Sequence, residues 1–267
     1  SIPPDVSYKN DMSGGWNTAA ALAAALVGGC ASAPDTLRLP HVSGFSSSPP
    51  GETLPAGWEP WTLSRLKKPT QYGLVDESGR TVVKASADAS ASGLIHRLDL
   101  DPKSFPFLNW RWKVTDLIRQ ADNTKRSTED SPVRVVVTFQ GDLDKLPLGD
   151  RLFFDAIRVA SGQQMPYATL MYIWENRAPA GTVIPNRHTS RVRMIVAESG
   201  SDKVGIWQEV TRNVYEDYRR AFGEEPGPIT AIGIMTDTDN TGENVHAYYG
   251  DIRFSRIAPP RLQLATD

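Results

Sequence analysis

The chain has 267 residues, a formal net charge of −2 and one cysteine, Cys30. This length fits one large domain or two small ones, and the balanced charge excludes the strong cationic field that holds nucleic acid. Because Cys30 is the only cysteine, a disulfide framework is excluded, and no thiol chemistry is available beyond residue 30.

Residues 1–30 are predicted to be an export signal. The stretch 18–29 is short, apolar and rich in Ala, as in a secretory signal rather than a membrane-spanning helix. The sequence Val-Gly-Gly-Cys over 27–30 resembles a lipobox, which implies lipidation of Cys30. Ala31, in place of Asp, then points to the outer membrane, facing the periplasm. The alternative is an Ala-rich helix with a buried free cysteine, since no Lys or Arg lies between Met12 and the apolar run.

The segment 31–53 is rich in Pro, Ser and Gly, which predicts a flexible linker between the lipid anchor and a folded domain. The domain is expected over 54–257 and a C-terminal tail over 258–267. After residue 30, no apolar stretch approaches the roughly 20 residues that a membrane-spanning helix needs.

Short runs with alternating apolar residues predict strands through most of this domain. Helical spacing predicts two helices, over 150–160 and 209–222, and the stretch 115–125 suggests one helical turn plus a loop. Many strands without a regular βαβ alternation predict an all-β fold, an antiparallel β-sandwich of jelly-roll type with one or two short helices. The predicted strands are 82–87, 93–98, 108–114, 133–139, 168–174, 191–196, 229–235 and 248–254.

Several motifs resemble the bacterial domain-of-unknown-function family 3047. They occupy 89–94, 108–114, 130–134, 167–174 and 235–242, and the likeness covers about residues 54–256. This family carries no established activity, so the resemblance implies no functional residues.

A looser likeness concerns the last strand, 247–254, which is similar to the closing strand of galactose-binding-like and carbohydrate-binding jelly rolls. In those folds an acidic pair on this strand often supports a structural calcium. Here Asp251 is acidic, but Gly250 stands in the other position. The likeness implies a sandwich that binds a glycan, and fold alone does not determine function.

The loop 237–242 is the first candidate site. Asp237, Asp239 and Asn240 place oxygen ligands close together before Gly242, a pattern suited to a hard cation such as calcium or to a ligand. Asp251 is the further metal candidate. The alternative is an Asx-rich hairpin loop without a ligand.

Arginines on the predicted outward faces of three strands are the second candidate site. If the alternating apolar residues face inward, the cations face outward, and neighbouring strands would form a guanidinium-rich surface. Guanidinium groups bind carboxylates and phosphates in bidentate fashion, which suits an acidic glycan. The alternative is an ordinary solvated sheet face. The residues concerned are Arg111, Arg134, Arg191 and Arg193, with Asn240 from the loop.

No nucleophile elbow, P-loop, dinucleotide-binding motif or zinc-binding pattern occurs. The remaining catalytic candidates are carboxylates that could pair in a glycosidase: Asp130, Glu175, Asp237 and Asp239. The leading hypothesis is therefore a lipid-anchored module that binds an extracytoplasmic glycan. The alternatives are a glycan-active hydrolase and an envelope scaffold that binds another protein.

Overall fold

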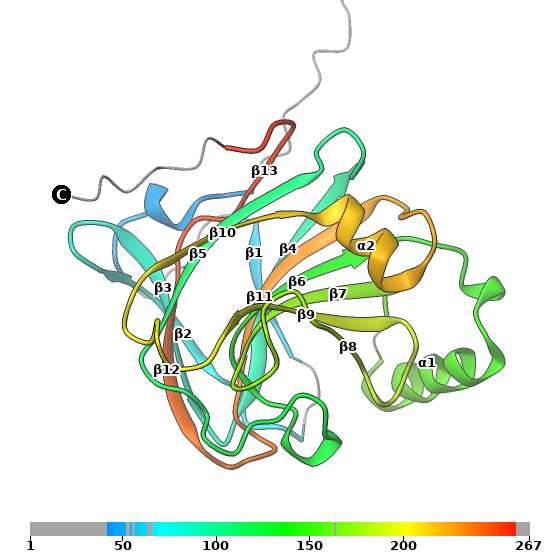
Figure 1. Ribbon diagram of the computed structural model, residues 1–267, viewed down its shortest axis with the longest axis horizontal. Helices are drawn as coiled ribbons and strands as arrows, with labels where there is room; N and C mark the ends of the chain where they lie inside the picture. The colour runs from blue at the N-terminus through cyan, green and yellow to red at the C-terminus, as the bar shows by residue number, and fades with distance from the viewer. Residues whose placement is uncertain (1–41, 52–53, 55–56, 63–65, 163, 260–267) are drawn as a thin grey trace, which may run out of the picture. The chain divides into compact units, whose positions relative to one another are not determined.

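The computed structural model describes residues 42–259 except 52–53, 55–56, 63–65 and 163 (Figure 1). These residues form a β-sandwich, as predicted, with two short α-helices in the described part. The strands pair antiparallel except β7 and β9, which run parallel. None of the described helices is long and apolar enough to cross a membrane.

One sheet has seven strands and the other has six. The seven-stranded sheet has the order β1 (Trp58–Trp61), β4 (Ala91–Leu100), β11 (Ile229–Asp237), β6 (Ser131–Phe139), β7 (Ala168–Glu175), β9 (Val192–Ser199) and β8 (Val183–Pro185). The six-stranded sheet has the order β10 (Gln208–Asn213), β5 (Phe107–Val114), β12 (Asn244–Tyr249), β3 (Thr81–Asp88) and β2 (Gln71–Asp76), with β13 (Arg253–Ser255) also paired to β5.

The core lies between the two sheets and is built from every second residue of each strand. Trp110 and Trp112 of β5 are buried, which confirms the inward face predicted from alternation. Their rings meet at 5.3 Å, and Trp110 lies 5.0 Å from Tyr172 of β7. Val133, Val135 and Val137 of β6 join the same cluster. The residues between them therefore face away from the core, and this outward face carries the candidate site.

The α-helices are α1 (Leu148–Ser161) and α2 (Val214–Phe222). The predicted helix 209–222 is wrong in its first part, because residues 208–213 form β10 and pair with β5 instead. The helix begins only after Asn213, whose side chain accepts a hydrogen bond from the backbone N–H of Glu216. The 3₁₀ helices are η1 (Phe45–Ser47), η2 (Arg126–Thr128) and η3 (Leu143–Lys145).

Two other predictions need correction. The single strand predicted over 248–254 is interrupted, because β12 ends at Tyr249 and β13 begins at Arg253. Residues 42–51, predicted to be linker, pack on the sandwich: Phe45 is buried and its ring lies 4.8 Å from that of Trp58. The apolar side chain of Phe45 was enough to join the core despite its polar neighbours. Cys30 and the signal segment lie outside the described residues.

Candidate functional site

The outward face of the seven-stranded sheet carries a row of side chains that share one register. Trp61, Gly93, Met235, Arg134 and Ile173 are directly paired across five neighbouring strands, β1, β4, β11, β6 and β7. Because paired residues in a sheet point to the same side, all of them lie opposite the core. The row therefore places one aromatic, one thioether and one guanidinium group on the same surface.

Glycine allows the indole of Trp61 to lie close to the sheet. A Cβ atom at Gly93 would lie 2.9 Å from Cε3 of Trp61, and one at Gly233 would lie 3.9 Å from the same atom. Trp61 and Met171 pack here on a small apolar cluster that includes Val136 and Met235. Trp61 is half-buried, and Cε3 of its indole lies close to the backbone of the sheet.

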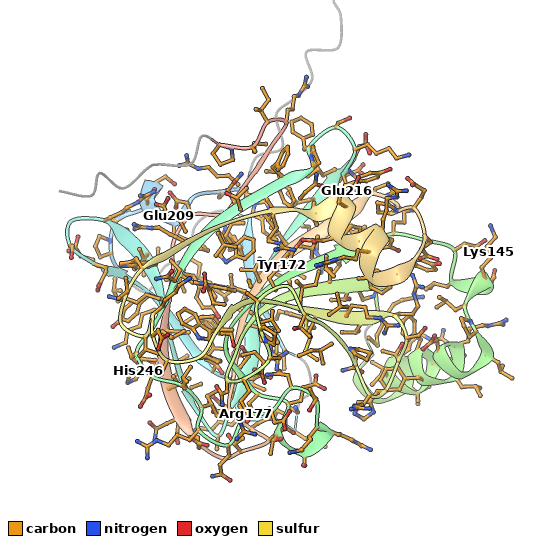
Figure 2. All side chains as sticks on the ribbon, in the orientation of Figure 1. Lys145, Tyr172, Arg177, Glu209, Glu216 and His246 are labelled. Atoms are coloured by element: carbon orange, nitrogen blue, oxygen red, sulfur yellow. The ribbon has the colours of Figure 1, made fainter. Side chains whose placement is uncertain are left out.

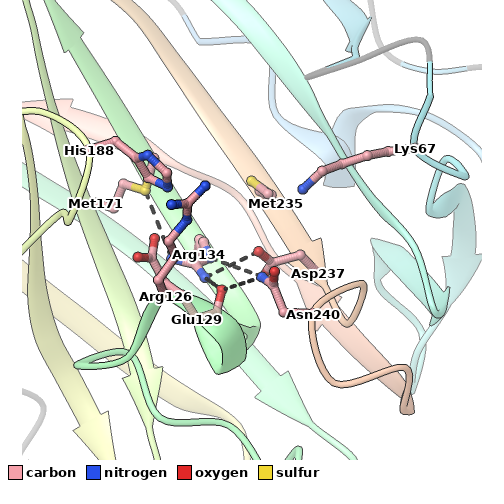
Figure 3. Close-up of a pocket in the computed structure, with 9 residues that line it drawn as sticks. All are labelled: Lys67, Arg126, Glu129, Arg134, Met171, His188, Met235, Asp237 and Asn240. Atoms are coloured by element: carbon pink, nitrogen blue, oxygen red, sulfur yellow. Dashed lines mark hydrogen bonds and ion pairs between the residues drawn. The ribbon is translucent and has the colours of Figure 1, made fainter. Parts of the chain in front are cut away.

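A cavity of about 350 Å³ opens beside this apolar strip (Figure 3). Its volume lies at the lower end of the roughly 300–1,000 Å³ typical of small-ligand sites. Figure 3 shows that strands, loops and a 3₁₀ helix contribute to it, with the methionines on the sheet and the longer polar side chains around them. The lining residues are Lys67, Arg126, Glu129, Arg134, Met171, His188, Met235, Asp237 and Asn240.

A buried ion pair lies at the base of the cavity. Nε and Nη2 of Arg134 donate to the two carboxylate oxygens of Asp237 at 3.0 and 3.1 Å. Only 2% of the Arg134 side chain and 6% of the Asp237 side chain are exposed. Arg134 also donates to the backbone oxygen of Glu129 at 2.9 Å and lies 3.2 Å from the sulfur of Met194. The pair thus ties β6 to β11 and to the loop before β6.

Burial raises the pKa of Asp237 to about 6, although the guanidinium of Arg134 acts in the opposite direction. The nearby carboxylate of Asp130 contributes to the increase. The charge of Arg134 is favoured by the same carboxylates, so its pKa is raised in spite of its burial. At neutral pH both members of the pair are therefore charged.

Asp130 holds the loop 237–242 in place. Its carboxylate accepts from the backbone N–H of Asn240 at 3.2 Å and of Thr241 at 2.7 Å, and from the Asn240 side chain at 3.0 Å. Asp239, in the same loop, pairs with Lys67 at 2.6 Å. These contacts fix the conformation of the Asx-rich loop 237–242.

The acidic residues predicted to bind calcium are only partly brought together. Oxygens of Asp130, Asp237 and Asp239 lie within 4.8 Å of one another, so Asp130 stands where Asp251 was expected. Both oxygens of Asp130 and of Asp237 already accept hydrogen bonds, and one oxygen of Asp239 is occupied by Lys67. The other oxygen of Asp239 is buried without a hydrogen-bond partner, and calcium binding at this loop stays a prediction.

Asp251 lies at a different place in the fold. Its carboxylate accepts hydrogen bonds from the backbone and the side chain of Ser46, and it pairs with Arg80 at 2.9 Å. Burial alone would raise the pKa of Asp251, but these contacts lower it below its usual value. Asp251 thus anchors η1 to the end of the six-stranded sheet and is not part of the loop site.

A family model described as "Protein of unknown function (DUF3047)" matches residues 56–253. The chain belongs to the DUF3047 family. None of the curated proteins matches it.

Solved structures similar to this DUF3047 chain include proteins that act on or bind carbohydrates. A family 11 carbohydrate-binding module from Clostridium thermocellum, in complex with a mixed-linked tetrasaccharide, shares 10% identity at a TM-score of 0.39 and covers 75% of this chain and 89% of its own. The xyloglucanase domain of NopAA, an effector from Sinorhizobium fredii, shares 9% identity at a TM-score of 0.40. The match covers 79% of this chain and 99% of the xyloglucanase domain. Likenesses this distant leave the function of the DUF3047 chain to its own residues.

The predicted cationic surface is not formed by the DUF3047 domain. Arg111 lies on β5 in the six-stranded sheet, whereas Arg134 belongs to the other sheet. Arg191 is 7% exposed and pairs with Glu224 at 2.5 Å. Arg193 is half-buried and donates to backbone oxygens. The alternation correctly placed Arg134 away from the core, but loops and carboxylates cover that part of the sheet.

The other predicted residues have structural positions. Glu175 is buried and accepts hydrogen bonds from the backbone N–H groups of Asn123, Arg177 and Ala178, which excludes it from a cleft. Asp130 is buried beneath the loop. The lining residues that the sequence prediction missed include Met171, Met235 and Lys67, together with the adjacent Trp61. Glycines on two neighbouring strands at the Trp61 contact were the available signal.

Proposed function

We propose that this domain binds an uncharged oligosaccharide along the outward face of the seven-stranded sheet. The observation that carries the proposal is the apolar strip of Trp61, Met235 and Met171, which leads directly into a cavity with polar residues around it. A pyranose ring has apolar C–H faces and a rim of hydroxyl groups, so it needs both kinds of surface. Such a mixture of apolar walls and a few polar groups is typical of small-ligand sites.

The charges of the cavity support an uncharged ligand. Lys67 is paired with Asp239, and Arg134 is paired with Asp237, so these four groups neutralise one another. Glu129 accepts from the side chain of Asn186 at 3.2 Å. Arg126, which is exposed, and Glu129 remain as opposite charges at the opening. Hydroxyl groups can donate to the carboxylate and accept from the guanidinium without bringing in a further charge.

Isothermal titration with cello-, xylo-, manno- and malto-oligosaccharides tests this function. We expect one of these series to bind. The Trp61→Ala variant should weaken that binding by about tenfold or more, because it removes a stacked aromatic contact. Leu152→Ala is a suitable control, because Leu152 is 60% exposed on α1 and does not line the cavity. The proposal is wrong if none of the series binds, or if both variants bind as the original chain does.

The carboxylates in the cavity favour one second candidate, a glycan hydrolase. Glu129 and Asp237 line the same cavity, which brings together two carboxylates, as a glycosidase requires. Incubation of the bound oligosaccharide with the protein should then release shorter products, and Glu129→Gln should abolish the release while binding persists. Intact oligosaccharide after prolonged incubation would leave binding as the function.

We also propose that the domain works outside the cytoplasm on a lipid anchor at Cys30, in the outer membrane facing the periplasm. The support is the apolar stretch 18–29 and the small residues before the cysteine. Mass spectrometry of the protein from its native membrane tests this: the N-terminal peptide should begin at Cys30 and carry acyl chains. A peptide that contains residues on both sides of Cys30 would contradict the anchor.

A further inference from the structure

The outward face of the six-stranded sheet carries a second group of aromatic and cationic side chains. Lys113 on β5, Tyr248 on β12 and Lys84 on β3 are directly paired across three neighbouring strands. Arg111 precedes Lys113 by two residues on β5 and therefore points to the same side. Trp207, just before β10, completes the group. Because this face lies on the opposite side of the sandwich from the cavity, the two surfaces are separate.

Arg111 is held in place but has no anionic partner. Its guanidinium lies 4.4 Å from the centre of the Trp207 ring. Gly250 makes room for it, since a Cβ atom there would lie 2.4 Å from Cγ and Nε of Arg111. Nε is buried without a hydrogen-bond partner, and no carboxylate of the described residues pairs with the guanidinium. Stacking on Trp207 thus fixes the guanidinium, and the half-buried Arg111 has no ion pair among the described residues.

The neighbouring charges leave this surface cationic. Lys113 pairs with Glu77 and lies 4.6 Å from the centre of the Tyr248 ring. Asp251 is already held by Ser46 and Arg80. Glu209, opposite Arg111 on β10, is the remaining nearby acid. Lys84 is half-buried and has no ion pair within the described part of the chain.

We propose that this surface, formed by Arg111, Lys113, Lys84, Trp207 and Tyr248, binds a carboxylate-bearing oligosaccharide. A planar guanidinium matches a carboxylate through two parallel hydrogen bonds. The rings of Trp207 and Tyr248, whose centres are 6.5 Å apart, hold the cations by cation–π contacts and add apolar surface beside them.

The spacing of the cations favours a chain with repeated charges. Two residues along a strand span about 7 Å, and two strand spacings span about 10 Å. The backbone positions of Arg111, Lys113 and Lys84 are therefore set at sugar-sized intervals, and Arg111 and Lys84 are the two of these cations without an ion pair in the described part of the chain. An oligomer of uronic acid, with one carboxylate on each ring, fits this arrangement.

Isothermal titration with tri-galacturonate, and with a neutral trisaccharide of galactose, tests the proposal on the full chain. We expect tri-galacturonate alone to bind, with an affinity that falls as salt is added. Arg111→Ala should weaken the binding by about tenfold or more, the usual loss for a charge-assisted bidentate contact. Arg111→Lys keeps the charge but loses the planar guanidinium group. Its affinity for tri-galacturonate should lie between the affinities of the original chain and of Arg111→Ala.

Two controls make the result specific. Arg158→Ala removes an exposed cation of α1 and should leave the affinity within about twofold of the original. An oligo-aspartate peptide of equal charge tests whether the surface accepts any polyanion. The proposal is overturned if tri-galacturonate does not bind at millimolar concentration, if the neutral trisaccharide or the peptide binds equally well, or if Arg111→Lys binds like the original. None of these results bears on the cavity, since it lies on the other sheet.

Discussion

The buried pair of Arg134 and Asp237 is the single interaction on which the cavity depends most. A buried ion pair gives little net stability compared with a well-packed apolar pair, but removal of one partner leaves the other charge without compensation. In this domain the carboxylate of Asp130 lies beside the pair, so loss of the arginine would leave two neighbouring acids.

Arg134→Met should therefore lower the free energy of unfolding by about 3–5 kcal/mol at pH 7, the range for breaking a buried ion pair. The loss should be smaller at pH 5, because Asp237 can then take up a proton. Urea denaturation at both pH values measures this. Arg158→Met, which breaks an exposed pair with Asp155, serves as the control and should cost less than about 1 kcal/mol. Equal effects of the two variants would contradict the prediction.

Asp237 also determines a pH dependence of stability. Burial raises its pKa to about 6 in the folded protein, above the ordinary value of about 3.9 for an aspartate. The folded state therefore binds the proton more tightly, and the stability that this gives is present below pH 4 and lost as the pH rises through 6. Between pH 4 and pH 7, the free energy of unfolding of the original chain should fall by on the order of 2–3 kcal/mol relative to that of Asp237→Asn, because asparagine does not titrate. A constant difference between the two would show that Asp237 has an ordinary pKa.

Short elements at the edges of the sandwich complete its core. The 3₁₀ helix η1 places Phe45 against Trp58 and fixes Ser46 on Asp251 of the other sheet. Since β1 also carries Trp61, η1 supports the strand that holds the proposed aromatic platform.

Phe45→Ala should therefore destabilise the domain by about 3–5 kcal/mol, the usual cost for a buried phenylalanine. Leu148→Ala is the control, because Leu148 is 69% exposed, and its effect should stay below about 0.5 kcal/mol. Thermal and urea denaturation of both variants provide the measurement. If Phe45→Ala is as stable as the original chain, residues 42–51 are a linker after all.

At the scale of the whole molecule, the sandwich presents two outward faces with different chemistry. The face of the seven-stranded sheet carries Trp61, methionines and charged groups that are paired with one another. The face of the six-stranded sheet carries the guanidinium of Arg111 beside Trp207, without an ion pair among the described residues. In Figure 2, Glu209 and His246 mark the strands of the six-stranded sheet, and Tyr172 lies in the interior. The core separates the two faces.

The two proposed ligands should therefore bind independently. Saturation with the neutral oligosaccharide should change the affinity for tri-galacturonate by less than about twofold, because sites without shared residues or a moving element have no coupling free energy. Titration of one ligand in the presence of the other measures the coupling. Mutual exclusion would mean that both ligands occupy one face, which would contradict the assignment of separate surfaces.

The sequence by itself determined the strands with clear alternation and the side of each strand that faces the core. Trp110 and Trp112 were correctly placed inside, and the strands 133–139 and 168–174 lie within β6 and β7. Alternation is a local property of each strand, so one sequence is enough to read it. It failed at residues 209–213, where the apolar spacing also fits a helix and pairing with β5 decides the outcome.

Only the tertiary structure decided which side chains meet. The sequence showed that Arg111 and Arg134 face outward, but not that they belong to different sheets, because strand order depends on pairing between distant segments. It suggested Asp251 as a partner of the loop 237–242, whereas packing placed Asp130 there. Trp61 and Met235 are 174 positions apart (235 − 61) and become neighbours only through β4, which lies between their strands. Periodicity therefore determines the direction of each side chain, and the contacts between strands determine the site.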